Sequence, residues 1–362
     1  MYGRTAPDLA LLQNCRNSLC NVLAPGGVRP PNGRMRTKPL LRPPARIAAW
    51  TLALLLSACG GGGGDDPDPA ASDQLLGLQV AGHPHAVDVY RTAGARRAIV
   101  LLHGGGGNKS AIAHQVGLNA SATTTSMATI DWAWLHSHQV MLVVPQGQSI
   151  PSEPGATTWT NHAMNSGQDD QAFLQALAAR LRSDFGITHL TLVGHSMGGT
   201  MTNRMWCESP ATFDAYVSIA GPASSAYTRA GTPCTPGAAA HPYLGIIGDT
   251  DGVMQTAGAW TAPTWTVNPL FVGLSFRAWD NDVVIGEFQQ QKARAATVCG
   301  GTLAEGDFVR QGSVDTWTTC GGRLVLQRVS GADHGIASID ERMGTSSAHD
   351  VIDTADAFAT GR

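Results

Sequence analysis

Charged residues are scarce in this chain of 362 residues: they make up 14% of it, and the formal net charge is −3. That fraction is low for a cytosolic protein, whereas a hydrophobic content of 43% is enough for a sizeable core. We therefore expect a globular, exported protein. Lys and Arg form no cluster outside the N-terminal region, so no basic field attracts phosphate backbones, and nucleic acid is excluded as a partner.

The apolar stretch near the N-terminus is too short to span a bilayer, which requires roughly 20 residues. It runs from Ile47 to Ala58, follows the basic segment MRTKPLLRPPAR that begins at Met35, and ends at Cys59. This layout is typical of a secretory signal. The residues LSAC resemble a bacterial lipobox, in which the cysteine is lipidated; the alternative is an ordinary signal peptide in which Cys59 has no such role.

These features divide the chain into four parts. Residues 1–34 are expected to be a non-structural extension, residues 35–59 the signal peptide, residues 60–72 a flexible linker and residues 73–362 one globular domain. The mature protein is then expected outside the cytoplasm, either secreted or tethered to a membrane by acyl chains. Gly60 stands where inner-membrane lipoproteins carry an aspartate, which favours the outer membrane.

Four of the seven cysteines lie in the expected domain, namely Cys207, Cys234, Cys299 and Cys320. Four cysteines in an exported domain suggest two disulfides. Four cysteines can pair in three ways. The local pairs, Cys207 with Cys234 and Cys299 with Cys320, close the shortest loops. No CxxC pair supports a zinc site instead, so no metal is expected.

Short apolar runs alternate with helical segments along the domain. One helical segment begins at Asp169 with an acidic start, carries Phe173, Leu177 and Leu181 on one face, and ends at a glycine. This alternation predicts an α/β fold with a mostly parallel sheet flanked by helices on both faces. The expected strands are Ala98 to Leu102, Val140 to Val144, Leu190 to Val193, Ala215 to Ile219, Tyr243 to Ile247 and Leu324 to Val329. The aperiodic stretch from Met254 to Val284 is interpreted as an insertion.

A serine stands between glycines in the segment GHSMG, from Gly194 to Gly198. The strand LTLV precedes it, and GTMTNRMWCE, which can form a helix, follows. This context is that of a nucleophile elbow, a strained turn that exposes the serine hydroxyl. We therefore predict Ser196 as a nucleophile; the alternative is a tight turn that needs small residues.

A serine nucleophile needs a base and a carboxylate that orients the base. His334 lies in a glycine-flanked loop after the last expected strand and is predicted as the base. Asp251, or less favourably Asp249, follows the strand YLGIIG at the same sheet edge, whereas Asp333 is expected to cap a loop. The histidines of HPH at His83 and of HSH at His136 are expected in surface loops rather than at metal sites, and His349 at the start of the terminal helix.

Acyl transfer also needs donors for the negative oxygen of the tetrahedral intermediate. The segment LLHGGGGN follows a predicted strand, at the place where hydrolases of this kind have their oxyanion loop. The N–H groups of Gly105, or of Gly104, and of Met197 are the predicted donors. A phosphate loop is the alternative, but no GK[ST] follows the glycines.

Together these motifs resemble the secreted polyhydroxybutyrate depolymerase and feruloyl esterase group of the α/β-hydrolases. The resemblance covers about residues 97–361 and rests on LLHGGGGN, LVGHSMGG, GIIGDTDGV and SGADHG. It implies the α/β-hydrolase fold, maps the acid onto Asp251, and matches Cys207 with Cys234 and Cys299 with Cys320. His195, Gly335 and Ile336 depart from the group's usual residues around the acyl pocket, so the resemblance carries the mechanism over more safely than the substrate.

The sequence therefore predicts a serine carboxylic-ester hydrolase that needs no cofactor. Its expected partners are an ester substrate, either a hydroxyalkanoate or a short-acyl or aryl ester, and the membrane through its lipid anchor. The candidate substrate contacts are His195, Trp159 and Trp265, with Trp260 and Trp279 in loops or in the insertion. A single tryptophan is more often a core residue than a ligand contact, because tryptophan is highly buried on average. The rival hypothesis is a non-catalytic surface lipoprotein that retains the fold.

Overall fold

The computed structural model describes residues 72–151, 153–162, 164–224, 227, 234, 236–237, 241–251, 253, 287–344 and 347–362. The predicted extension, signal peptide and lipidation site at Cys59 lie outside these residues, as does the insertion from Met254. The first strand begins at Ser72, the last residue of the predicted linker. No helix in the described ranges combines the length and the apolar character needed to cross a membrane.

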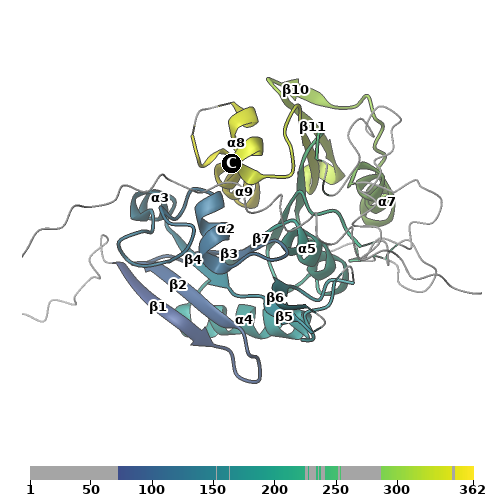
Figure 1. Ribbon diagram of the computed structural model, residues 1–362. Helices are drawn as coiled ribbons and strands as arrows, with labels where there is room; N and C mark the ends of the chain where they lie inside the picture. The colour runs from purple at the N-terminus through teal and green to yellow at the C-terminus, as the bar shows by residue number, and fades with distance from the viewer. Residues whose placement is uncertain are drawn as a thin grey trace, which may run out of the picture. The chain divides into compact units, whose positions relative to one another are not determined.

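A ten-stranded sheet forms the centre of the domain (Figure 1). Its strand order is β1-β2-β4-β3-β7-β8-β9-β12-β11-β10. The six strands from β4 to β12 run parallel, and the two strands at each end pair with their neighbours in antiparallel fashion. The parallel strands are β3 (Arg97–Leu102), β4 (Val140–Pro145), β7 (His189–His195), β8 (Ala215–Ile219), β9 (Tyr243–Gly248) and β12 (Leu324–Val329). These are the six strands expected from the apolar runs, so the predicted mostly parallel sheet is confirmed.

The remaining strands were not expected from the sequence. They are β1 (Ser72–Gln79), β2 (Ala86–Thr92), β10 (Val309–Gln311) and β11 (Val314–Thr319) in the large sheet, and β5 (Gln148–Ile150) and β6 (Glu153–Thr158) in a separate two-stranded sheet. Most of them carry exposed or half-buried positions, as in β1 and β10. They lack the continuous apolar run of a strand that is buried on both faces.

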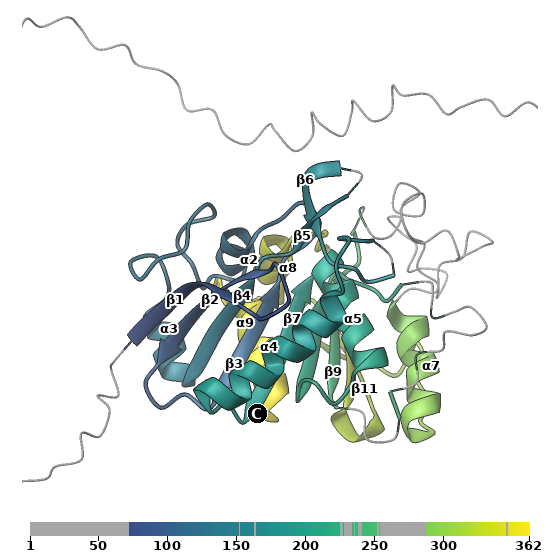
Figure 2. The same cartoon turned by 90° about the horizontal axis from the view of Figure 1, so that it is seen from below.

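Helices cover both faces of the sheet, and each cover has its own core. On one face lie α4 (Asp170–Phe185), α5 (Met197–Glu208) and α7 (Glu287–Cys299), of which α4 and α5 cross the strands in Figure 2. On the other face lie α2 (Lys109–Gln115), α3 (Trp132–His138), α8 (Ile336–Met343) and α9 (Asp350–Thr360). Alternate residues of β3 enter the two cores: Val100 packs under α4, whereas Ile99 faces the other side.

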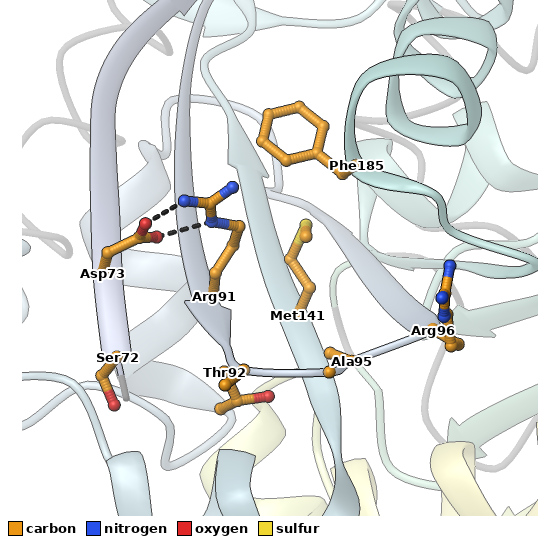
Figure 3. Close-up of a pocket in the computed structure, with 10 residues that line it drawn as sticks. Ser72, Asp73, Arg91, Thr92, Ala95, Arg96, Met141 and Phe185 are labelled. Atoms are coloured by element: carbon orange, nitrogen blue, oxygen red, sulfur yellow. Dashed lines mark hydrogen bonds and ion pairs between the residues drawn. The ribbon is translucent and has the colours of Figure 1, made fainter. Parts of the chain in front are cut away.

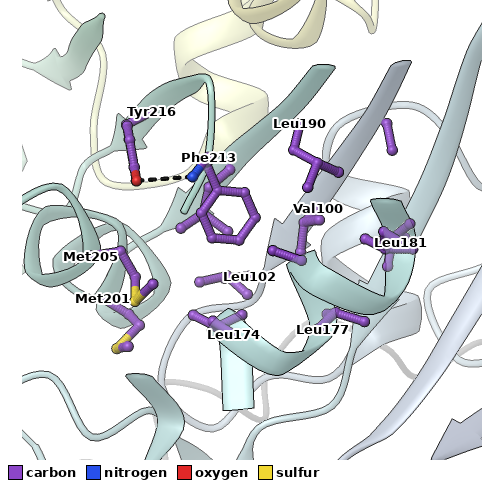
Figure 4. Packing of buried hydrophobic residues seen from close by; sticks show 14 of the residues in the cluster. Val100, Leu102, Leu174, Leu177, Leu181, Leu190, Met201, Met205, Phe213 and Tyr216 are labelled. Carbon is purple, nitrogen blue, oxygen red and sulfur yellow. Dashed lines mark hydrogen bonds between the residues drawn. The ribbon is translucent and has the colours of Figure 1, made fainter. Parts of the chain in front are cut away.

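The helix α4 shows how the sequence pattern becomes packing. Its N-cap Asp169 accepts a hydrogen bond from the Ala172 N–H at 3.0 Å, and Gly186 ends it in the left-handed conformation. Leu174, Leu177 and Leu181 point from this helix toward β3 (Figure 4). The predicted helical face is therefore confirmed.

Two disulfides close local loops in the domain. Cys207 at the end of α5 pairs with Cys234, and Cys299 at the end of α7 pairs with Cys320 in the short 3₁₀ turn η4 (Cys320–Gly322). These are the pairings that close the shortest loops, so that prediction is confirmed. The second disulfide fastens α7 to the segment that leads into β12.

Candidate active site

Ser196 lies in the turn between the central strand β7 and helix α5. Its backbone has φ 54° and ψ −119°, a conformation that residues other than glycine rarely adopt and that marks a strained turn. A Cβ atom added at Gly194 would lie 2.2 Å from the Gly198 carbonyl oxygen, and one at Gly198 would lie 2.4 Å from the Leu102 carbonyl oxygen. The glycines are therefore required by close backbone contacts, and the turn has the geometry of a nucleophile elbow.

The imidazole of His334 joins two of the predicted residues. Its Nε2 lies 2.9 Å from Ser196 Oγ, and its Nδ1 lies 2.8 Å from Asp251 Oδ2. Sheet register explains the meeting: Val329 at the end of β12 pairs with Gly248 at the end of β9, so the loops after the two strands begin side by side. Ser196 emerges at the same carboxyl edge from β7.

The three aspartates near His334 differ in their hydrogen-bond partners. Asp251 is 1% exposed, and its second oxygen, Oδ1, accepts from the Val253 N–H at 2.8 Å. Asp249 instead accepts from the Gly331 N–H at 2.6 Å. Asp333 accepts from the Gly335 N–H at 2.8 Å, which confirms its predicted role as a loop cap. Of the three, only Asp251 faces the imidazole.

The glycine loop after β3 lies against the elbow. A Cβ at Gly104 would be 3.1 Å from Ser196 Cβ, and one at Gly105 would be 3.3 Å from Met197 Cγ. Gly106 donates its N–H to the Thr157 carbonyl and Gly107 to the Gly104 carbonyl. Within the described ranges the Gly105 N–H has no acceptor, and Met197 is the first residue of α5, whose opening N–H groups have no partner inside the helix.

His103 anchors this glycine loop and was missed in the sequence, although it directly precedes the glycine run. Its Nδ1 donates to the Gly104 carbonyl at 2.8 Å, and its Nε2 accepts from the Gly147 N–H at 2.9 Å. Burial lowers the pKa of His103 to about 4, so the ring is neutral near pH 7 and keeps this donor and acceptor arrangement.

The predicted substrate contacts are placed differently by the structure. Trp159 is fully buried in the core and donates its indole N–H to the His103 carbonyl at 2.9 Å, so it supports the glycine loop from below rather than lining a pocket. His195 is 7% exposed, and its ring turns toward the main chain of His334. Trp265, with Trp260 and Trp279, lies outside the described residues.

The expectations about the other histidines are confirmed only in part. The HPH segment lies in the loop between β1 and β2, as expected, but His85 within it is fully buried, with its Nε2 2.6 Å from Asp170 Oδ1. His136 lies in α3 instead of a loop. His349 is the N-cap of α9, as expected. In the part of the chain that the structure describes, no group of three or more His, Cys, Asp or Glu side chains is arranged to hold a metal ion.

A surface hollow of about 400 Å³ lies elsewhere on the domain (Figure 3). Its wall includes an ion pair between Asp73 and Arg91, with Phe185 and Met141 nearby. Met141 is near the start of β4, whereas Ser196 follows the end of β7, so the hollow lies at the opposite edge of the sheet from Ser196.

Comparison with known proteins agrees with this fold. A model of the alpha/beta hydrolase family matches residues 99–357. The chain belongs to this family. A relative in Nocardia uniformis subsp. tsuyamanensis, named "Putative esterase NocK", is 30% identical over 201 residues, which are 52% of this chain and 51% of that protein. The chain thus spans about half the length of this curated relative.

Solved structures of low sequence identity are also similar to this chain. Acetyl xylan esterase from Aspergillus awamori has 12% identity and a TM-score of 0.46, with 80% of this chain and 99% of that chain covered. TT1662 from Thermus thermophilus has 13% identity and a TM-score of 0.45, with 81% and 100% covered.

Proposed function

We propose that this alpha/beta hydrolase is a serine carboxylic-ester hydrolase. The observation that carries the proposal is the position of the His334 ring, 2.9 Å from Ser196 Oγ and 2.8 Å from Asp251 Oδ2. An ionised carboxylate only accepts hydrogen bonds, so Nδ1 carries the hydrogen and Nε2 is left to accept from the serine hydroxyl. This is the tautomer that a general base needs.

The reaction then follows from these contacts. His334 takes the Ser196 proton as Oγ bonds to the ester carbonyl carbon, and Asp251 stabilises the imidazolium that forms. The N–H groups of Gly105 and Met197 hold the negative oxygen. His334 next gives its proton to the departing alcohol, which leaves an acyl group on Ser196. Water, activated by the same imidazole, releases the acid and restores the hydroxyl.

We further propose the class of ester that the enzyme hydrolyses. The resemblance to polyhydroxybutyrate depolymerases favours hydroxyalkanoate esters. The alternative is an esterase of the feruloyl or acetylxylan type, acting on aryl or short-acyl esters. The name of the Nocardia relative supports an esterase without selecting among these. Clearing of a hydroxybutyrate polymer suspension, compared with release of ferulate from its methyl ester, separates the two classes.

Hydrolysis of p-nitrophenyl acetate and butyrate tests the ester chemistry. We expect turnover by the native protein and a loss of at least about 10⁴-fold in kcat for Ser196→Ala, because the nucleophile is gone. Ser183→Ala is the matched control, since that serine is exposed near the end of α4, which leads into the start of β7, whereas Ser196 follows the end of that strand. Absence of turnover in the native protein, or equal turnover in Ser196→Ala, contradicts the proposal and favours a non-catalytic lipoprotein.

We also propose that the enzyme works outside the cytoplasm, anchored through Cys59. The two disulfides support an oxidising location. Growth with radioactive palmitate is expected to label the native protein and to leave Cys59→Ala unlabelled. Equal labelling of the two proteins contradicts the anchor, and labelling of neither indicates an ordinary signal peptide.

A further inference from the structure

Two consecutive residues of the elbow contact the same histidine. Ser196 Oγ lies 2.9 Å from the ring Nε2 of His334, and His195 Nε2 lies 2.9 Å from the main-chain carbonyl oxygen of His334. The two rings are close, with centroids 5.0 Å apart and planes tilted by 43°. A carbonyl oxygen only accepts, so His195 carries its hydrogen on Nε2 and is the donor.

Among the described residues, the main chain of His334 has few other hydrogen bonds to hold it in place. His334 lies in the loop between β12 and α8, outside the hydrogen-bonding ladder of the sheet. Within the described ranges, His195 is the only donor to its carbonyl oxygen. His195 itself is the last residue of β7 and pairs with Ile219 of β8 in the middle of the sheet. The bond therefore ties the loop that carries His334 to the end of the strand that leads into Ser196.

The surroundings of His195 keep it uncharged. The ring is buried beside His334 and Asp251, and a Cβ at Gly104 would lie 3.4 Å from its Nδ1. Burial first, and then the neighbouring His334, lower the pKa of His195 to about 4. A neutral His195 donates to the carbonyl without placing a second positive charge beside the imidazolium that catalysis creates.

We infer that His195 is a positioning residue for the general base: its N–H fixes the main chain of His334, while Ser196 and Asp251 fix the ring. The inference rests on the proposed ester hydrolysis and adds a residue to it. It also explains why His195, predicted as a substrate contact, is turned away from solvent. The side chain acts through His334 and does not touch the reacting atoms.

Three variants test the role. His195→Leu keeps the bulk and removes the donor, His195→Gln keeps an N–H at the end of the side chain, and His195→Asn is polar but too short to reach the carbonyl. His189→Leu is the matched control, because His189 starts the same strand at the opposite edge of the sheet. We expect kcat for p-nitrophenyl butyrate to fall about 10²-fold in the Leu and Asn variants, as for a misplaced catalytic group. KM should stay unchanged, Gln should restore most of kcat, and the control should match the native enzyme.

Hydrogen exchange of residues 330–336, followed by mass spectrometry, gives a readout that does not depend on activity. Exchange there should be faster in His195→Asn and His195→Leu than in the native protein and in His195→Gln. Native kcat in the Asn variant, or a Gln variant as impaired as Asn, overturns the inference. If the native protein has no esterase activity, the proposed function fails, and the exchange rates alone then decide whether His195 positions the His334 loop.

Discussion

Asp249 and Asp251 stand two residues apart after β9, and their hydrogen bonds give them different tasks. Asp251→Asn should lower kcat by about 10⁴-fold, because an amide beside Nδ1 favours the wrong imidazole tautomer. Asp249→Asn should stay within a few-fold of the native enzyme, because the amide oxygen still accepts from the Gly331 N–H. Steady-state kinetics of the two variants with p-nitrophenyl butyrate make the comparison. Equal losses in both would show that Asp251 is not the orienting acid.

The buried His103 predicts a pH dependence of stability. Its folded pKa of about 4 is below the value of about 6.5 in an unfolded chain. The unfolded state therefore binds the proton first, and stability is lost as the pH falls from about 6.5 to about 4, by up to about 1.4 kcal/mol per pH unit. Above pH 7 this group contributes no slope.

Urea denaturation between pH 7 and pH 4.5 measures this effect. His103→Gln removes the titrating group and should flatten the fall in the free energy of unfolding, whatever its stability at pH 7. Other buried groups, including His195, remain in both proteins, so the difference in slope belongs to His103. Parallel curves for the two proteins would mean that His103 is protonated as easily in the folded state as in the unfolded one.

Single residues were predictable where a motif requires a particular backbone conformation or where the residues of a site follow a fixed order along the chain. Ser196 follows from glycines whose side-chain positions are occupied by backbone, and His334 from its place after the last parallel strand. The burial of Trp159 agrees with the usual burial of tryptophan, whereas its hydrogen bond to the His103 carbonyl was not predictable, because it joins segments far apart in the sequence. The orientation of His195 depends on a loop that lies far away in sequence, so no local pattern indicates it.

At the scale of elements, α4 packs one leucine-rich face onto the sheet (Figure 4). Leu177 is fully buried in that face, so Leu177→Ala should lower the free energy of unfolding by about 2–5 kcal/mol through lost burial and the cavity left behind. Val309→Ala is the control: Val309 is 73% exposed on the edge strand β10 and should change stability by less than about 0.5 kcal/mol. Chemical denaturation measures both, and similar costs would contradict the described packing of α4.

The buried parallel strands were predictable from the sequence, whereas the edge strands were not. Parallel strands are buried on both faces and therefore read as apolar runs, which is why β3, β4, β7, β8, β9 and β12 were all expected. The edge strand β1 alternates half-buried and exposed positions over much of its length. Such a strand is fixed by pairing with a neighbour rather than by its own composition, so its sequence alone does not distinguish it from a loop.

At the scale of the whole molecule, the disulfides hold the carboxyl-terminal part of the domain together. The Cys299–Cys320 loop spans 21 residues, and constraining a loop of that size in the unfolded chain stabilises a protein by about 3 kcal/mol. Replacing both cysteines by alanine should lower the free energy of unfolding by that order, and reduction of the native protein by dithiothreitol should act in the same direction. An unchanged denaturation midpoint in both experiments would contradict this stabilising role.

The molecule as a whole brings three distant segments to one edge of a parallel sheet. Ser196 arrives from β7, Asp251 from β9 and His334 from β12, and all three loops leave the sheet on the same side. The fold class and the order of these residues were predictable because parallel strands place every strand-to-helix loop at one edge.

Reaction with a fluorophosphonate, followed by intact mass and peptide mapping, tests the central claim most directly. A serine activated by His334 and Asp251 should attack the phosphorus, release fluoride and retain one phosphonyl group on the peptide that contains Ser196. The heat-unfolded protein, in which the three residues are apart, should not react. No mass gain in the native protein, or a phosphonyl group on another residue, would contradict the account.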